Sequence, residues 1–257
     1  MTIGIAIPLK SKKISRDWQV TCASLEATID SILAQSDSDY KVVVVGHDCP
    51  DFLVAMNQPN IKFVLATFPA PDRSSPSFTT QDLINDKTLK IISSLYELRN
   101  ENLAYVYQLD SDDLIHKDFV KRVKLIKDTS AIILGSGYLY YKSSNRYIET
   151  AELDQLCGST VVVAADAFTF PTEIDISLIH DIPWTKYRHM NIYKFFEYDT
   201  KQPYIRLNEK LVTYVLASGD NFSDRWRDSW IKKLKWKLKP YLQGRKVDTE
   251  FKNNFLG

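Results

Sequence analysis

The feature of this sequence that most constrains its fold is the run of four valines within Lys41-Val-Val-Val-Val-Gly46. A continuous β-branched run without polar alternation is typical of a strand that is covered on both faces, as in a parallel sheet. Three other apolar runs have a similar character and lie at residues 3–8, 61–66 and 104–109. The first half of the chain therefore predicts a series of buried strands.

Two amphipathic segments separate these strands and predict helices at residues 18–35 and 82–98. The predicted inward face of the second helix holds Ile84, Thr88, Ile91, Ile92 and Leu95. Strands and helices that alternate in this way predict an α/β fold, in which right-handed crossovers form a mostly parallel central sheet flanked by helices.

The pattern changes after Asp113. The elements predicted there are a helix at residues 119–127 and strands at 131–141, 160–165 and 211–217. A polar connection rich in Ser, Asn and Glu separates the first two of these strands. We therefore divide the sequence into a first half (1–113), a second half (114–223) and a C-terminal tail (224–257).

Composition argues against several classes of protein. A net charge of +1 over 257 residues gives no electrostatic reason to expect nucleic acid as a partner. Cys22, Cys49 and Cys157 are odd in number and widely spaced, which favours reduced thiols in a cytoplasmic protein over a disulfide framework or a zinc site. We expect no secretory leader, and no apolar stretch approaches the ~18 residues expected of a membrane span.

The C-terminal tail is basic and aromatic between residues 225 and 242. Trp226, Trp230, Leu234 and Leu238 recur every four residues and would form an apolar stripe on a helix rich in lysine. Two interpretations remain open: a helix that packs on the protein with a solvated basic face, or a helix that attaches peripherally to an anionic membrane at its inner face.

Three carboxylates follow the fourth predicted strand, in Asp110-Ser111-Asp112-Asp113. Carboxylates packed so closely repel one another, and a divalent cation such as Mg²⁺ or Mn²⁺ would relieve that repulsion. The alternative is a solvated turn, because Asp and Ser side chains often bond to nearby backbone groups.

Ligands of parallel sheets bind at the carboxyl ends of the strands, so the loops at residues 46–50, 68–80 and 110–113 should open on the same edge. The second of these loops is long and contains Pro69, Pro71 and Pro76. Such a loop is either flexible or a lid over a ligand.

Taken together, these features resemble the glycosyltransferases of the GT-A fold, closest to the family-2 type that uses nucleotide sugars. The resemblance covers residues 3–221. It rests on the opening Ile5-Ala-Ile-Pro8 strand, the helix from Leu25 to Gln35, the valine strand, and Leu109-Asp110-Ser-Asp112-Asp113 in the place of that family's Asp-x-Asp motif. The resemblance implies a Rossmann-like domain over residues 1–223, in which the first half binds the nucleotide and a smaller sheet in the second half faces the acceptor, followed by a basic C-terminal helix.

The same resemblance implies roles for particular residues. Asp110 and Asp112 look like the Asp-x-Asp pair, which contacts the ribose and the metal ion, and Asp113 would assist in metal binding.

Three further residues would contact the donor nucleotide. Pro8 would line its pocket. Asp48 stands where family members recognise a uracil ring, although Gly46-His47-Asp48 replaces the commoner Asp-Asp-Gly pattern. Lys87 would hold phosphate near the start of its helix.

An inverting transferase needs a base beside the sugar, because the acceptor hydroxyl loses its proton as it attacks. In the resembled family this base comes from an acidic pair before a helix. Ile179-His180-Asp181-Ile182 is the matching segment, with His180 in place of the first acid and Asp181 as the predicted catalytic base. An Asp at this position could instead cap the following helix. His180 and His189 are alternative metal ligands.

The implied activity is the metal-dependent transfer of a sugar from a nucleoside diphosphate, expected to be a UDP-sugar, to a hydroxyl of a carbohydrate or lipid-linked acceptor, as in polysaccharide biosynthesis. A second interpretation is a sugar-phosphate nucleotidyltransferase. That class carries a Gly-rich basic loop after the first strand, and Leu9-Lys-Ser-Lys-Lys13 has no glycine. A third interpretation is a protein without catalysis that senses nucleotide sugars or docks on a membrane as a scaffold.

Overall fold

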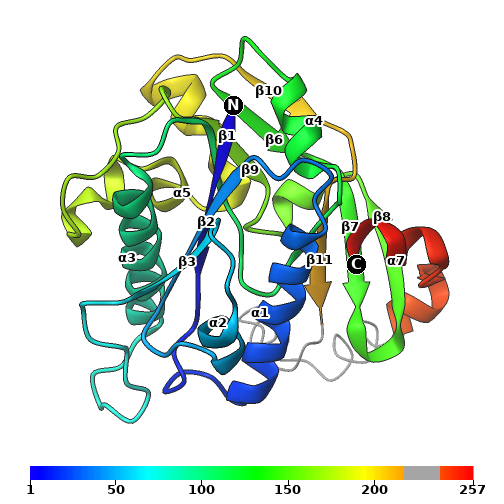
Figure 1. Cartoon of the computed structure of the whole chain (residues 1–257), viewed down its shortest axis with the longest axis horizontal. Helices are drawn as coiled ribbons and strands as arrows, with labels where there is room; N and C mark the ends of the chain where they lie inside the picture. Colours follow the sequence, from blue (N-terminus) through cyan, green and yellow to red (C-terminus); the bar gives the residue numbers. More distant parts are fainter. Residues whose placement is uncertain (217–237, 257) are drawn as a thin grey trace.

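The computed structural model describes residues 1–216 and 238–256. Its centre is a seven-stranded sheet with the order β10-β6-β9-β4-β1-β2-β3 (Figure 1). The strands are β1 (Thr2–Pro8), β2 (Tyr40–Gly46), β3 (Ile61–Leu65), β4 (Leu103–Gln108), β6 (Ala131–Leu134), β9 (Val161–Ala164) and β10 (Tyr204–Leu207). All pairs in this sheet are parallel except those that β9 makes with β4 and β6. The predicted α/β fold with a mostly parallel central sheet is confirmed.

Helices cover both faces of this sheet. They are α1 (Trp18–Leu33), α2 (Asp51–Ala55), α3 (Thr80–Leu98), α4 (Phe119–Leu125) and α5 (Pro183–Lys186). In Figure 1, α1 and α3 lie on opposite sides of the sheet. Asp17 begins α1 by accepting hydrogen bonds from the backbone N–H groups of Gln19 and Val20. The Thr79 and Asp82 side chains form a capping box that begins α3.

The prediction that Ile84 belongs to the inward face of α3 is wrong. Ile84 is 40% exposed, whereas the buried part of the helix begins at Thr88. The turns before Thr88 face the loop between β3 and α3 across a cavity that Asp82, Asn85 and Asp86 line. The periodicity of the helix therefore continues beyond the part that the sheet covers.

A smaller sheet has the order β12-β8-β7-β11-β5. Its strands are β5 (Leu114–Ile115), β7 (Gly137–Tyr141), β8 (Arg146–Thr150), β11 (Val212–Leu216) and β12 (Arg245–Lys246). The prediction of a single strand at residues 131–141 is wrong. These residues form two strands, β6 in the large sheet and β7 in the small one. A Cβ at Gly137 would lie 2.5 Å from the Val212 backbone oxygen, so the chain enters the second sheet at a position where only glycine fits.

The strand β8 lies in the connection that was predicted as merely polar. Asn145 begins the return from β7 with a φ of 50°, a left-handed conformation that asparagine tolerates. The alternating residues of Arg146–Thr150 then pair antiparallel with β7. A half-exposed antiparallel strand shows polar residues on one face, which explains why the pattern was missed.

The described part of the C-terminal tail packs on the small sheet. Phe251 and Phe255 of α7 (Thr249–Phe255) are buried against Tyr138, Tyr140 and Tyr147, and the Tyr147 and Phe251 rings stack at 4.6 Å. Figure 1 shows α7 beside β7 and β8. Most of the basic segment at residues 225–242, including its three tryptophans, lies outside the described residues. Within the described residues, no helix has the length and apolar character needed to cross a bilayer.

Candidate active site

Residues 110–113, which we call the acidic loop, follow β4 at the carboxyl edge of the large sheet. Ser159, just before β9, holds this loop in place. Its Oγ accepts a hydrogen bond from the Asp110 backbone N–H at 2.8 Å and donates one to Asp113 Oδ2 at 2.7 Å. Because Ser159 is fully buried, both bonds are shielded from water.

Asp113 lies inside the protein, with 0% of its surface exposed. Its Oδ2 also accepts a hydrogen bond from Cys157 Sγ at 3.1 Å, and its Oδ1 accepts one from the Val215 backbone N–H at 3.1 Å. Burial, together with the charges of Asp112 and Asp110, raises the pKa of the Asp113 carboxyl well above its usual value. Asp113 was predicted as a third metal ligand, but protein donors occupy both of its oxygens.

Asp110 forms an ion pair with Lys87 of α3. Lys87 Nζ lies 2.5 Å from Asp110 Oδ1, which also accepts a hydrogen bond from Gln108 Nε2 at 2.7 Å. Burial opposes ionisation of Asp110, but the Lys87 ammonium and these hydrogen bonds hold its pKa below the usual value. Burial also opposes the charge of Lys87, and pairing with Asp110 raises its pKa overall. The fold thus brings together two residues that were assigned to donor binding.

Gly158 lies against this ion pair. A Cβ at Gly158 would lie 2.7 Å from Asp110 Oδ2 and 3.5 Å from Lys87 Nζ. The close approach of the carboxylate therefore requires glycine at this position. Neither Gly158 nor Ser159 was predicted to contact the acidic loop, because no local pattern relates residues 49 positions apart.

Asp112, like Asp110, is half-buried in the acidic loop. Burial and the charge of Asp110 raise the pKa of Asp112 to about 6. A divalent cation beside it would favour the ionised form. Within residues 1–216 and 238–256, no group of three or more Asp, Glu, His or Cys side chains is arranged to hold a metal ion. Two carboxylates fit Mg²⁺ or Mn²⁺ when substrate phosphates supply further ligands, so the residues present suit an ion that binds together with a donor.

His189 lies close enough to Asp110 for the charge of each to affect the pKa of the other. Burial lowers the pKa of His189, which favours the neutral ring. Its Nε2 lies 3.3 Å from the Gln155 carbonyl oxygen, to which it donates a hydrogen bond. Sequence analysis named His189 only as an alternative metal ligand, and the structure places it beside the acidic loop.

The other two predicted nucleotide contacts have different surroundings. Pro8 is buried at the end of β1, opposite Val45 of β2. Asp48 Oδ2 accepts a hydrogen bond from the Lys12 backbone N–H at 2.8 Å. This bond ties the loop after β1 to the loop after β2 and occupies one of the oxygens that were predicted to recognise uracil.

Asp181, the predicted catalytic base, follows the 3₁₀ helix Ile176–His180 and is exposed. It does not cap α5, whose N-cap is Ile182. The hydrogen bonds that hold the acidic loop come from other groups. The role of Asp181 stays a prediction.

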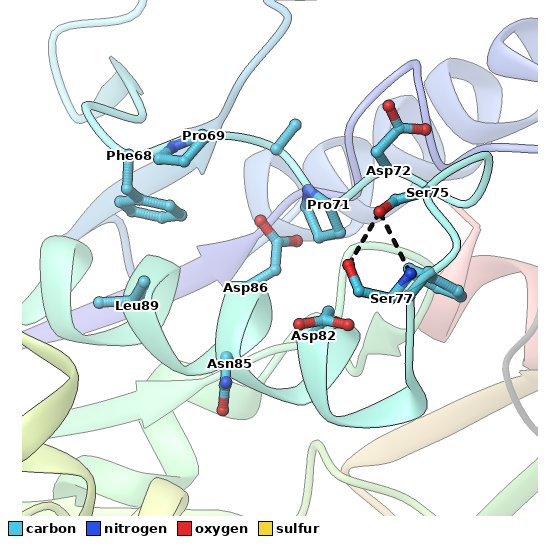
Figure 2. Close-up of a pocket in the computed structure, with 12 residues that line it drawn as sticks. Phe68, Pro69, Pro71, Asp72, Ser75, Ser77, Asp82, Asn85, Asp86 and Leu89 are labelled. Carbon is cyan, nitrogen blue, oxygen red and sulfur yellow. Dashed lines mark hydrogen bonds between the residues drawn. The ribbon is translucent and has the colours of Figure 1, made fainter.

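A cavity of about 330 Å³, which we call the loop pocket, lies between α3 and the loop that joins β3 to α3 (Figure 2). An ion pair between Lys13 and Asp72, with Nζ and Oδ2 2.7 Å apart, ties this loop to the segment after β1. Asp86 points into the pocket from α3, one residue before Lys87. The apolar walls of the loop pocket include Phe68, Pro69, Pro71 and Leu89.

No protein-family model and no curated protein matches this sequence.

Several solved structures match most of this chain at low identity. Residues 1–349 of TarS from S. aureus match with a TM-score of 0.48 and 12% identity over 84% of this chain and 60% of that one. The mannosyltransferase PcManGT from Pyrobaculum calidifontis, in complex with GDP-Man and Mn²⁺, matches with a TM-score of 0.49 and 14% identity over 94% of this chain and 62% of that one. Rv0371c from Mycobacterium tuberculosis, in complex with manganese, has a TM-score of 0.41 and 11% identity, over 88% of this chain and 96% of that one.

These matches cover most of this chain, and one of the matched proteins is a mannosyltransferase. This chain spans less than two thirds of the length of TarS 1–349 and of PcManGT. Its own residues are the basis for assigning a function.

Proposed function

We propose that this protein is a glycosyltransferase that moves a sugar from a nucleoside diphosphate to a hydroxyl group of a carbohydrate or lipid-linked acceptor, with the help of a divalent cation. The observation that carries the proposal is the acidic loop, where Asp110 and Asp112 lie beside Lys87 at the carboxyl edge of a parallel sheet. Sheets of this class bind nucleotides at that edge.

Asp110 and Asp112 would hold the cation. When bound, Mg²⁺ or Mn²⁺ supplies positive charge that stabilises the departing diphosphate. Lys87 would exchange its contact with Asp110 for phosphate oxygens, since its raised pKa keeps the ammonium charged at neutral pH. Ser159 and Asp113 would keep the acidic loop in a fixed position while the substrates bind.

A metal-dependence assay tests the proposal. Donor hydrolysis and sugar transfer are measured with nucleoside diphosphate sugars and Mn²⁺, and again after chelation. We expect activity only with the cation and a loss of at least about a hundredfold in Asp112→Asn. Gly158→Ala keeps every carboxylate but displaces Asp110, so it should lower activity about tenfold or more. Asp166→Asn is the matched control, because Asp166 is an exposed aspartate outside the site.

Turnover that is independent of metal, or an Asp112→Asn variant with full activity, would contradict the proposal. Synthesis of a nucleotide sugar from a nucleoside triphosphate and a sugar phosphate would instead indicate a nucleotidyltransferase.

The acceptor's proton has two candidate destinations. Asp181 is implied by the resemblance to the family, and His189 has a neutral ring close to Asp110. Replacement of the true base should lower kcat by about 10²-fold to 10⁴-fold. A comparison of Asp181→Asn with His189→Asn therefore shows which residue is the base. If the product retains the anomeric configuration of the donor, neither residue is needed as a base for an inverting attack.

A further inference from the structure

Three apolar side chains near the C-terminal end of the chain are exposed to solvent. Among the large apolar side chains of the described residues, Leu242 is the most exposed, at 80%. It belongs to a short helical stretch at residues 238–243, just before β12. Tyr241 and Leu238 of the same stretch are 60% and 45% exposed. We call these three side chains the apolar tip. Figure 1 shows this end of the chain at the outer edge of the small sheet, where β12 pairs with β8.

The apolar tip occupies one face of the helix. Successive helical residues are about 100° apart, so Leu238, Tyr241 and Leu242 together span about 100° around the axis. Pro240 projects from the other side of the helix and is buried. The apolar tip therefore points away from the body of the protein.

Backbone contacts fix this helix on the small sheet. Arg146 of β8 donates hydrogen bonds from Nε to the Pro240 carbonyl oxygen at 2.9 Å and from Nη2 to the Gly244 carbonyl oxygen at 3.0 Å. A Cβ at Gly244 would lie 2.5 Å from the Pro240 oxygen, so the tight turn after the helix requires glycine. The apolar tip is thus presented by a fixed part of the fold.

Basic side chains flank the apolar tip on both sides. The Arg146 guanidinium lies over the Tyr241 ring, 5.6 Å from its centroid. On the opposite flank, Lys239 lies about 60° around the helix from Leu242. Positive charge therefore borders the exposed apolar surface.

The strand that follows adds to this charge. Arg245 and Lys246 are both exposed in β12. Of the acidic side chains next to them, Glu149 pairs with Lys210 as well as with Arg245. Asp248 caps α7. The surface around the apolar tip therefore has an excess of positive charge.

The distribution of charge in the sequence favours an anionic partner. Residues 225–246 contain nine Lys and Arg and one Asp, whereas the whole chain has a net charge of +1, so the rest of the chain is net acidic. Two copies of so basic a surface would repel each other. Nucleic acid would match the charge but would leave the leucines in water. An anionic bilayer accepts both kinds of side chain, because apolar groups enter the acyl boundary while Lys and Arg contact the head groups.

The apolar tip lies at the end of the small sheet that contacts the acidic loop. The Val215 backbone N–H donates to Asp113, and Val215 pairs with Tyr140 of β7. The next residue of β7, Tyr141, pairs with Arg146 of β8, which holds the helix of the apolar tip. Adjacent strands are about 4.8 Å apart, so Arg146 lies about 10 Å across the sheet from Val215.

We propose that the apolar tip, with the basic residues around it, docks this protein peripherally on an anionic lipid bilayer. The inference does not depend on the proposed function. Leu238, Tyr241 and Leu242 enter the lipid, and the basic residues Lys239, Arg245 and Lys246 contact anionic head groups.

Vesicle sedimentation tests the inference with the whole chain. Binding is measured to vesicles of phosphatidylcholine alone and of phosphatidylcholine mixed with phosphatidylglycerol, at low and at high salt. We expect binding to be at least about tenfold tighter with phosphatidylglycerol, and this advantage to be lost at high salt. Absence of binding to the anionic vesicles, or equal binding to both kinds, would overturn the inference.

A first variant tests the apolar contribution. The double substitution Tyr241→Gln with Leu242→Gln removes apolar surface without a change of charge, and both positions are exposed, so the fold should be unaffected. Binding to the anionic vesicles should weaken about tenfold or more. Val54→Gln with Leu125→Gln, at two exposed apolar positions on other helices, is the matched control and should bind as wild type does. Full binding by the Tyr241→Gln and Leu242→Gln variant would overturn the inference.

A second variant tests the charge. Lys239→Gln with Lys246→Gln should weaken binding to the anionic vesicles about tenfold. The control is Lys121→Gln with Lys127→Gln, which removes two exposed lysines from α4 and the segment after it and should leave binding unchanged. If the two double variants bind equally well, the basic residues of this surface do not contact lipid and the inference is wrong.

Two other partners would give different results. A second copy of the chain would appear in analytical ultracentrifugation as a dimer that Tyr241→Gln with Leu242→Gln dissociates. Nucleic acid would appear as binding to a duplex oligonucleotide that phosphatidylglycerol vesicles do not displace. Either result in place of vesicle binding would overturn the inference.

The transfer assay separates this inference from the proposed function. A protein that transfers sugar but binds no anionic vesicle would overturn the inference alone. A protein that binds anionic vesicles through the apolar tip but transfers no sugar would overturn the function alone.

Discussion

Ser159 joins the acidic loop to β9 through one hydroxyl group. Its Oγ contacts the Asp110 backbone and the Asp113 carboxylate, and both Ser159 and Asp113 are fully buried. Ser159→Ala would leave a buried donor and a buried acceptor without this partner. We expect a loss of about 1–3 kcal/mol in the free energy of unfolding, measured by urea denaturation. Ser143→Ala, at an exposed turn residue, is the control and should change stability by less than about 0.5 kcal/mol. An equal effect of the two substitutions would refute this role for Ser159.

The docking of α7 should depend on pH through His116. The His116 ring contacts Phe255 of α7 edge to face, with centroids 5.3 Å apart, and its Nδ1 accepts a hydrogen bond from the Asp118 backbone N–H at 3.0 Å. Burial lowers the pKa of His116 in the folded protein. The charged groups that face this ring are Lys117, Asp118, Arg122 and Glu209.

Because the folded pKa is the lower one, the unfolded chain binds the proton first. Stability should therefore fall as pH decreases from about 7.5 through the unfolded value near 6.5, down to the folded pKa. His116→Asn retains an acceptor for Asp118 but does not titrate in this range. We expect the difference in Tm between wild type and His116→Asn to shrink as the pH falls. A difference that is constant with pH would exclude His116 as the titrating group.

Both sheets belong to one folded unit. A single apolar cluster includes Ile5 of β1, Leu139 of β7 and Leu216 of β11, and so extends from the large sheet to the small one. We therefore expect residues 1–113 and 114–216 to unfold together. Far-ultraviolet and near-ultraviolet circular dichroism should give coincident urea transitions. Separate transitions would show that the two halves are independent.

The sequence alone determined the strands β1 to β4, the helices α1 and α3, and the placement of three carboxylates at a sheet edge. These features depend on the periodicity of neighbouring residues, which the chain displays directly. The long loop with Pro69 and Pro71 was also recognised as a possible lid, although its contacts with α3 were not predictable.

Only the tertiary structure decided the rest. It separated β6 from β7, inserted β9 antiparallel between β4 and β6, turned Asp113 inward and brought Gly158 against Asp110. It also placed His47 beside Asp86, from a loop and a helix 39 residues apart in the sequence. Such contacts depend on strand order and register, which are settled by packing among distant segments and leave no periodic trace in any one of them.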